Sequence, residues 1–440
     1  APNQGLRFRV PSLDGYDGGL LPLKQWGPFK EMLLDSGGAR AQVDRAPAAL
    51  IRDHISGIPD PWLLGWLNVK YVVMDRLNDA WVDGVYHDLG TPVRLTGAQP
   101  FRFQQWEPVS ATHVSVATYL ENAGHVPQGT PVARVVVEGV EGDAEPRAWV
   151  LRAGVDTADS EGAALAGVRH LIPRPAATRR DLPTGRIYTT RLDLGGVFRP
   201  KSFQIESLVN QEVLGIAGVA WIDDRTGAST SAPLDARLKR VHTGDLKVYQ
   251  NESALPRAFL ATGVQRLEGD AALRALPKLL PGQVVLPPEP GGAAVAGGNP
   301  GLSRALIAEY TPERVVIDAE TQAGGYLVLT DSHYPGWRAW VDGIETDILR
   351  ANVLFRAVLL PPGAHRVEFR FEPASLRWGA LVSAATAVGL AMALLGWAFT
   401  WAAVLSLRWL RTGPRVVRAA GAGFAGTLAR VKALLRKRGR

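Results

Sequence analysis

The chain has 440 residues, no cysteine and a formal net charge of +7. Without cysteine, disulfide bonds, cysteine-ligated zinc and thiol nucleophiles are excluded. The basic excess is confined to residues 408–440, which carry ten Lys or Arg and no acid, while the rest of the chain sums to −3. Positive charge gathered beside an apolar segment indicates contact with anionic lipid headgroups, so we expect no nucleic-acid partner.

The first part of the chain mixes helix and strand patterns. Residues 20–34 and 46–55 have a helical spacing of apolar side chains. The run VKYVVM at 69–74 is β-branched and aromatic, which is typical of a buried strand. The sequence therefore predicts a small α/β unit over residues 1–107.

From residue 108 onwards strand patterns dominate. Short runs rich in Val, Ile, Thr and aromatic residues are separated by Gly, Pro and Asp, with a turn expected at 223–227. The predicted strands are 112–119, 131–137, 147–154, 185–194, 201–208 and 213–222. Such spacing is typical of an antiparallel sandwich or jelly roll, which we assign to a domain of residues 108–235.

A second, mainly β domain is predicted over residues 236–376, with a Gly/Pro-rich linker at 287–300. The Pro335-Gly336 pair suits a type II turn, and Asp342-Gly343 predicts a two-residue hairpin. A second hairpin is expected around Pro361-Pro362-Gly363, where a strand at 351–360 meets the last strand. In that last strand apolar and charged residues alternate, so one face should be buried. The apolar positions are Val367, Phe369 and Phe371.

A long apolar segment follows this domain. Residues 378–407 contain no Asp, Glu, Lys or Arg, and about 20 apolar residues suffice to cross a bilayer. We predict a transmembrane helix at 377–409, whose small residues favour packing against other transmembrane helices of the same protein. By the positive-inside rule, the basic tail 410–440 is cytoplasmic and residues 1–376 are extracytoplasmic.

Two short segments connect this helix to its surroundings. The link Glu372-Pro373 is expected to hold the preceding β domain close to the bilayer surface. The stretch 416–438 is basic and partly amphipathic, so we expect it to lie along the cytoplasmic leaflet. The predicted fold class is therefore α+β and mainly β, with β-sandwich or jelly-roll domains ahead of one transmembrane helix and a basic tail.

The start of the chain is unlike the start of an exported protein. Ala1 is not Met, and no signal-peptide pattern follows it. A translocated domain needs an export signal, so we expect this chain to be the C-terminal part of a longer, polytopic membrane protein.

The segment 327–373 carries the most specific motifs, namely TDSHYPGW, W-x-D-G, RANVLFRAV and PPGAHRVEFRFEP. In this order they resemble the C-terminal part of the YfhO family of bacterial membrane proteins. DGYDGGL at 14–20 and LNVKYVVM at 67–74 are similar to the start of that family's extracytoplasmic domain. The resemblance covers about residues 11–90 and 245–407, and the intervening sandwich looks instead like an inserted jelly roll of galactose-binding-like type.

This resemblance implies a many-helix protein akin to the GT-C glycosyltransferases. Such enzymes transfer a sugar from a polyprenyl-phosphate carrier to a cell-surface glycan outside the membrane. Their acidic catalytic residue lies in an early loop, which corresponds to a position before Ala1, so no catalytic residue is carried over. No cofactor is visible in the sequence, and a divalent cation is a candidate for the full-length protein only.

The first candidate binding residues lie on a Gly-rich loop, where Asp14 and Asp17 flank Tyr16. Carboxylate oxygens at this spacing suit a divalent cation or a sugar hydroxyl. The alternative is a tight turn in which the Asp side chains cap backbone donors.

A second group surrounds the Pro-Gly turn. An aromatic ring beside a carboxylate suits a sugar, since rings pack on its apolar face and carboxylates bond its hydroxyls. The alternative is that these side chains fill the sheet core and rest at the membrane interface. The residues are Asp331, His333, Tyr334, Trp337 and Trp340.

The third group consists of Arg350 and Arg356, which we expect on one face of a single strand with Asn352. Two guanidiniums on one face suit the phosphate of a lipid or sugar donor. The alternative is a solvated face paired with Glu345 or Asp347.

Other motifs point to no further chemistry. The histidines have no metal-ligand spacing, so no metal site is predicted. The glycines at 421–426 match G-x-G-x-x-G by chance, since no strand precedes them.

Two hypotheses about function stay open. In the first, the chain is part of a YfhO-like, GT-C-type glycosyltransferase or of a non-catalytic relative. In the second, it is a membrane-anchored β-sandwich module that binds glycan or a partner protein.

Overall fold

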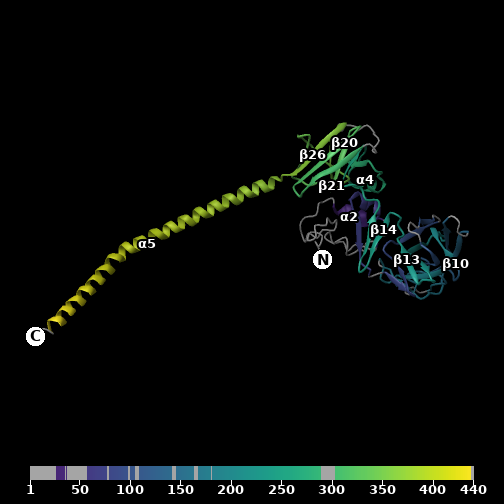
Figure 1. The fold of residues 1–440 in the computed structure, drawn as a ribbon, viewed down its shortest axis with the longest axis horizontal. Helices are drawn as coiled ribbons and strands as arrows, with labels where there is room; N and C mark the ends of the chain where they lie inside the picture. Colours follow the sequence, from purple (N-terminus) through teal and green to yellow (C-terminus); the bar gives the residue numbers. More distant parts are fainter. Residues whose placement is uncertain are drawn as a thin grey trace. The chain divides into compact units, whose positions relative to one another are not determined.

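The computed structural model describes residues 26–34, 36, 57–76, 79–97, 100–104, 109–140, 145–162, 167–179, 181–288 and 303–437. The predicted helix at 46–55 and most of the Gly/Pro linker lie outside these ranges. The chain divides into two compact units, Ala1–Tyr334 with Arg338–Arg370, and Pro335–Trp337 with Phe371–Arg440. The first unit is mainly β and the second contains one long apolar helix, so the predicted fold class is confirmed (Figure 1).

The N-terminal described elements are helices α2 (Trp26–Leu34) and α3 (Pro61–Trp66). The Asp60 carboxylate accepts hydrogen bonds from the first backbone N–H groups of α3, and Pro61 occupies a position that needs no N–H donor. A three-stranded sheet in the order β1-β15-β14 accompanies them. Its strands are β1 (Tyr71–Met74), β14 (Leu238–Thr243) and β15 (Lys247–Asn251).

The prediction of a buried strand at 69–74 is wrong. Tyr71 and Val73 of β1 are 57% and 59% exposed. β1 pairs only with β15, so it forms the edge of a small sheet and one of its faces is uncovered. Composition favours a strand, but it does not distinguish an edge strand from a central one.

The strands of the predicted sandwich are confirmed within a few residues at each end. They form a sheet in the order β13-β12-β6-β10-β9, with β4 also on β12, and a second sheet β5-β11-β7-β8. All their ladders are antiparallel, and Phe103, Phe203 and Trp221 pack between the sheets. The bounds are β4 (Val93–Thr96), β5 (Phe101–Gln104), β6 (Ala111–Glu121), β7 (Pro131–Gly139), β8 (Arg147–Arg152), β9 (Ala177–Thr178), β10 (Arg186–Phe198), β11 (Pro200–Ser207), β12 (Val213–Asp223) and β13 (Ala228–Ala232).

A hairpin of β2 (Ala80–Val82) and β3 (Val85–His87) precedes the sandwich and packs on it. Residues on both sides of the sandwich in sequence also share one hydrophobic core. In that core Phe29 and Trp66 join Tyr249, Tyr326 and Val328. The sandwich is therefore inserted into a body built from both flanking segments, while its jelly-roll type stays a prediction.

The body continues with two packed sheets, ordered β16-β21-β25-β24 and β19-β20-β26-β22-β23. Figure 1 shows β20, β21 and β26 together. A parallel pair, β17 with β18, encloses helix α4 (Gly269–Ala275) and the 3₁₀ turn η2 (Leu276–Lys278) in sequence. The strands are β16 (Ala258–Ala261), β17 (Gly263–Arg266), β18 (Gln283–Leu286), β19 (Arg304–Tyr310), β20 (Arg314–Thr321), β21 (Gly325–Ser332), β22 (Trp337–Val341), β23 (Ile344–Thr346), β24 (Leu349–Ala351), β25 (Phe355–Leu360) and β26 (Gly363–Phe371).

The predicted turns meet different outcomes. Asp342 and Gly343 have φ of 52° and 83°, which a type I′ turn requires, and β22 pairs with β23 as expected. The prediction of a second hairpin around Pro361-Pro362-Gly363 is wrong, because β25 and β26 lie in different sheets. Pro361 and Pro362 donate no backbone hydrogen bonds, so the chain crosses from one sheet to the other instead of folding back. Val367 and Phe369 of β26 are buried, as the alternation predicts.

The expected single strand at 351–360 is also interrupted. Asn352 and Val353 have φ of 46° and 69°, which turns the chain between β24 and β25. The two strands then pair antiparallel with each other. Asn352 tolerates positive φ, but a β-branched residue such as Val353 rarely adopts it, so local residue preferences do not predict this turn.

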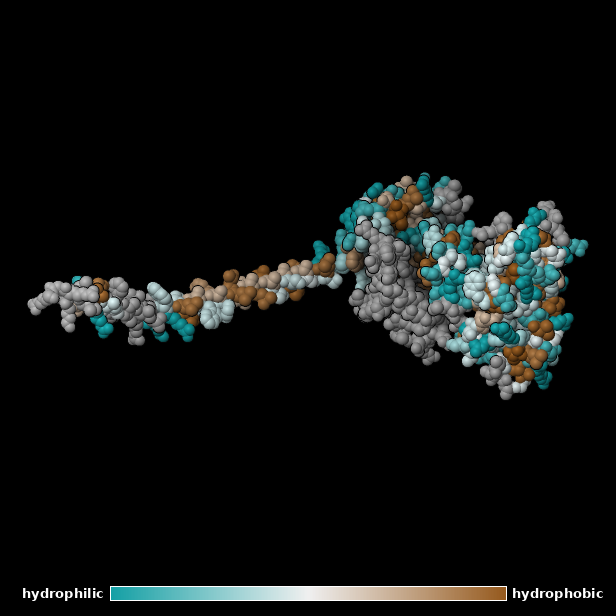
Figure 2. Space-filling view, turned by 60° about the horizontal axis from the view of Figure 1, so that its bottom comes forward, coloured by the Kyte–Doolittle hydropathy of each residue, from teal (hydrophilic) through white to brown (hydrophobic). Residues whose placement is uncertain are grey.

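Helix α5 runs from Ala374 to Lys437. Its part Ala374–Trp409 is long and apolar enough to cross a membrane, and within the described residues it is the one helix that is. Figure 2 shows apolar side chains along this part. The helix bends in its C-terminal half, where Pro414 removes a backbone hydrogen bond (Figure 1).

Candidate functional site

The loop with Asp14, Tyr16 and Asp17 lies outside the described residues. Its role as a cation or sugar site therefore stays a prediction. The other candidate residues are described. Asp331, His333, Arg350 and Arg356 lie close together, whereas Trp337 and Trp340 contact other side chains.

Four strands of the body bring charged residues to one end of the two packed sheets. Arg257 directly precedes β16, Asp331 lies near the end of β21, and Arg356 is near the start of β25. Because these three strands are antiparallel neighbours, the three positions meet at the same edge. Tyr310 ends β19 of the facing sheet and completes the group.

We call these four residues the Asp331 cluster. Asp331 Oδ1 accepts hydrogen bonds from Arg257 Nε at 2.9 Å and Nη2 at 2.7 Å, and Oδ2 accepts one from Arg356 Nη2 at 2.7 Å. The Tyr310 hydroxyl donates to the same carboxylate at 3.0 and 3.2 Å. The Arg257 guanidinium also lies 4.6 Å from the centre of the Tyr310 ring. Two guanidiniums around one carboxylate leave the cluster with a net positive charge.

Solvent reaches the Asp331 cluster from one side. The side chains of Arg356 and Asp331 are 2% and 11% exposed, whereas Arg257 is 32% and Tyr310 48% exposed. Burial, assisted by Asp331, raises the pKa of Tyr310 to about 12, so this hydroxyl stays a donor at neutral pH. Burial lowers the pKa of Arg356, and Asp331 opposes that shift.

Arg350 and His333 border this cluster. Arg350 on β24 lies opposite Arg356 on β25, so the two share a face through cross-strand pairing and not by alternation along one strand. Arg350 Nη2 is 3.6 Å from Glu268 Oε1, and Glu345 pairs with Arg338 instead of Arg350. Burial and the positive charges of Arg350 and Arg356 lower the pKa of His333, so its ring is neutral at pH 7.

The aromatic residues of the predicted sugar site already contact other side chains. Guanidiniums of Arg338 and Arg370 lie 5.3 and 4.8 Å from the centre of the Trp340 ring. The Trp337 ring packs against Phe371 with centres 5.3 Å apart. Tyr334 is 52% exposed.

Asp331 of the predicted sugar site is joined instead to Arg257 and Tyr310, which lie 74 and 21 residues away in sequence. No local motif indicates these contacts.

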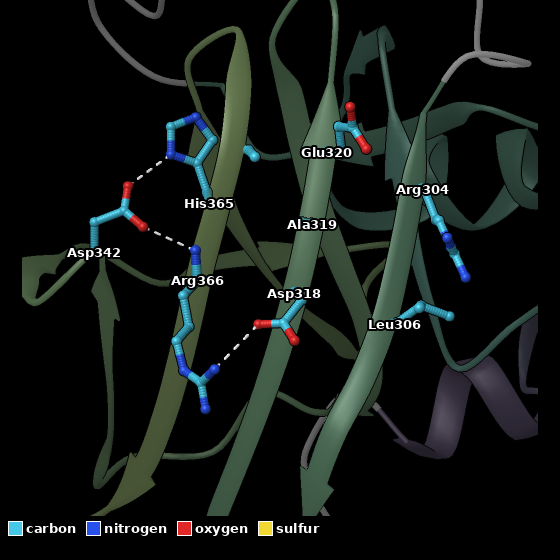
Figure 3. A pocket seen from close by; sticks show the side chains of 9 residues that line it. Arg304, Leu306, Asp318, Ala319, Glu320, Asp342, His365 and Arg366 are labelled. Carbon is cyan, nitrogen blue, oxygen red and sulfur yellow. Dashed lines mark hydrogen bonds and ion pairs between the residues drawn. The ribbon is translucent and has the colours of Figure 1, made fainter.

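A shallow groove of about 500 Å³ lies on the outer face of the five-stranded sheet (Figure 3). His365 Nδ1 and Asp342 Oδ2 are 2.7 Å apart, and the Arg366 backbone N–H donates to Asp342 Oδ1 at 2.8 Å. The hydrogen bond from His365 lowers the pKa of Asp342. Arg366 also reaches Asp318, 3.5 Å away. The charges of this groove largely balance one another across strands, so it is a weaker candidate for a charged ligand.

A second charged group lies between the segment before the sandwich and the strands that follow the sandwich. The sequence patterns did not predict it. Asp88 accepts hydrogen bonds from Lys247 Nζ at 2.7 Å, the Tyr249 hydroxyl at 2.5 and 2.6 Å, and Arg240 Nη1 at 2.8 Å. Lys247 Nζ also donates to Asp79 Oδ1 at 2.7 Å. We call these five residues the Asp88 cluster.

The Asp88 cluster is closed to solvent. The side chains of Asp88, Lys247 and Asp79 are 0%, 1% and 5% exposed. Burial raises the pKa of Asp88, but Lys247 and Arg240 overcome this effect and hold the pKa below its ordinary value. With its charges matched and its atoms enclosed, this cluster binds the segment before the sandwich to the strands that follow it.

Within the described residues, no group of three or more His, Asp or Glu side chains is placed to hold a metal ion.

Comparisons with known proteins add little to what the described site shows. No family model and no curated protein matches the chain. The structure of the mycobacterial arabinofuranosyltransferase AftD aligns with 71% of this chain at 13% identity and a TM-score of 0.18. A mutant of that enzyme aligns with 71% at 12% identity and a TM-score of 0.17. The chain spans about a quarter of the length of these structures, and TM-scores this low fall short of a shared fold, so we base no conclusion on them.

Proposed function

We propose that this chain is the extracytoplasmic region and final membrane helix of a GT-C-type glycosyltransferase or a non-catalytic relative. In this proposal the Asp331 cluster, with Arg350, binds the phosphate of a polyprenyl-phosphate sugar donor. The sequence resemblance to the YfhO family supplies the class. The net positive cluster at one end of the body is the observation that carries the proposed role.

The position of the cluster suits a lipid-linked phosphate. Tyr310 and Val315 are register partners between β19 and β20, and Arg314 pairs with Arg370 near the end of β26. The cluster therefore lies at the end of the body where the chain leaves for α5. Only Glu372 and Pro373 separate β26 from that helix in sequence. The expectation that this short link keeps the domain near the bilayer supports contact with a lipid phosphate.

The chemistry of the cluster also suits an anion. Guanidiniums form charge-assisted, often bidentate hydrogen bonds with phosphate oxygens. Arg257 and Arg350 are each 32% exposed, so both can be reached from solvent. The exposed rings of Tyr310 and Tyr334 offer apolar surface for a sugar or an isoprenoid unit.

The test is binding of farnesyl phosphate to the full chain in detergent, with farnesol as the uncharged probe. Arg350→Ala should weaken binding of farnesyl phosphate by about ten- to a hundredfold, because a hydrogen bond to a charged group contributes about 1.5–3 kcal/mol. Farnesol binding should not change. The matched control is Arg366→Ala, which removes an exposed guanidinium from the outer face of the same body. Equal affinity for the two probes, or an equal loss in the control, would contradict the phosphate site.

The second candidate function is a non-catalytic, membrane-anchored module that binds glycan. One observation favours it: Asp331 already accepts bonds from two guanidiniums and a tyrosine hydroxyl. A carboxylate so engaged is poorly placed to take a proton from a sugar hydroxyl. Binding of neutral cell-surface glycan with no preference for a phosphate would support this module.

A further inference from the structure

The C-terminal part of α5 continues as helix well beyond the membrane-spanning part. The apolar span ends at Trp409, whereas the helix ends at Lys437. The continuation contains no acidic residue. Pro414 lies five positions after the span, and α5 bends in this half of the helix (Figure 1). A bend there lets the following turns leave the direction of the span.

The sequence of the continuation separates apolar and basic positions at helical spacing. Apolar residues recur every three or four positions, and basic residues fall on the opposite side of a helix with 3.6 residues per turn. The apolar positions are Val417, Ala420, Phe424, Leu428, Val431 and Leu435. The basic positions on that side are Arg411, Arg415, Arg418, Arg430, Arg436 and Lys437, with Lys432 beside them.

Two described residues of the apolar side, Leu428 and Val431, are open in the structure. Leu428 is 50% and Val431 47% exposed, so both keep apolar surface in contact with solvent. Such surface is unfavourable in water at about 25 cal/mol per Å². An occupant is therefore needed that accepts apolar side chains on one side and basic ones on the other.

We propose that residues 415–437 form an amphipathic helix that docks on the surface of the anionic lipid leaflet next to the end of the span. Two features select lipid as the occupant. The helix is continuous with a segment that already crosses the membrane, and its charge is entirely positive, which complements phosphatidylglycerol and similar headgroups. This inference is independent of the Asp331 cluster and of any catalytic role.

The absence of cysteine makes the test direct, since one introduced cysteine gives one labelled site. We would label Val431→Cys with an environment-sensitive fluorophore in the full chain reconstituted into vesicles. The matched control is Ala433→Cys, two residues away on the basic side. In vesicles containing phosphatidylglycerol, the label at 431 should show blue-shifted emission and roughly threefold weaker quenching by acrylamide than the label at 433.

The lipid composition of the vesicles and the charge of the helix distinguish the possible outcomes. In pure phosphatidylcholine vesicles, or in the Arg430→Gln, Lys432→Gln double variant, the protection at 431 should diminish. Equal quenching at 431 and 433 in anionic vesicles would overturn the proposal. Protection that is the same in both vesicle types would overturn the role of anionic lipid. Protection that rises with the ratio of protein to lipid would assign the face to a second copy of the chain.

Discussion

The Asp88 and Asp331 clusters share their chemistry but differ in their access to solvent. In each, one carboxylate accepts hydrogen bonds from two basic side chains and a tyrosine hydroxyl. Tyr249 of the first cluster is fully buried, whereas Tyr310 of the second is 48% exposed. The charges of the first are matched, and those of the second leave a net positive charge. Similar residue types thus form a structural connection in one place and a candidate anion site in the other.

The difference shows what distinguishes the two roles. A sealed cluster has no surface for a ligand, and a broken pair inside it leaves a charge without water. In the open cluster water can replace a lost partner at Arg257 and Tyr310, so the cost falls mainly on Arg356, whose side chain is 2% exposed. Substitutions should therefore affect stability most at Asp88 and ligand affinity most beside Asp331.

The largest effect on stability is expected for Asp88→Asn. This change keeps the shape of the side chain but leaves Arg240 without its buried carboxylate and Lys247 with Asp79 alone, which costs about 3–5 kcal/mol. Chemical denaturation followed by tryptophan fluorescence measures the loss. The matched change Asp331→Asn should cost clearly less, and equal losses at the two sites would remove the distinction between the clusters.

The next effect is a dependence of stability on pH at His87, which neighbours Asp88 and is fully buried. Burial lowers its pKa from 6.5 to about 4. The unfolded chain therefore takes up a proton at His87 near pH 6.5, whereas the folded chain does so only near pH 4. Stability is present above pH 6.5 and falls as the pH drops towards 4, by about 3 kcal/mol in total.

A His87→Gln variant tests this dependence. The variant should be less stable than the original chain at pH 7, because the glutamine amide is buried in place of the imidazole. Between pH 6.5 and pH 4 it should lose less stability than the original chain, because glutamine takes up no proton. Denaturation midpoints at several pH values give the comparison. Identical slopes for the two proteins over that interval would contradict the assignment to His87.

A third, smaller effect concerns the two tyrosine hydroxyls. Tyr249→Phe removes a donor from a carboxylate that water does not reach, so we expect a loss of about 1–3 kcal/mol. Tyr310→Phe removes the corresponding donor at an exposed site and should cost less than about 1 kcal/mol. The same denaturation assay applies to both, and a larger loss for Tyr310 would reverse the comparison.

The smallest effect on stability is expected for Arg350→Ala. The partly exposed pair of Arg350 with Glu268 has atoms 3.6 Å apart, and such pairs contribute about 0–1 kcal/mol. The melting temperature should change little, while the affinity for farnesyl phosphate falls as proposed above. A large loss of stability with no loss of affinity would place Arg350 among the structural residues.

The sequence alone predicted the features that depend on neighbours along the chain. The strands of the sandwich follow from short runs of β-branched and aromatic residues between turn residues. The Asp342-Gly343 turn follows from the ease with which these residues adopt positive φ. The membrane helix follows from thirty positions without a charged residue, since no water is present in a bilayer to solvate one.

Only the tertiary structure decided which segments meet. Local patterns did not show that β1 is an edge strand or that the chain changes sheets at Pro361 and Pro362, because both depend on strands distant in sequence. Asp88 meets Lys247 and Tyr249 across 159 and 161 residues, and Asp331 meets Arg257 across 74. Hydrogen bonds and burial act over a few ångströms in space, whatever the separation along the chain, so the clusters exist only once the sheets have packed.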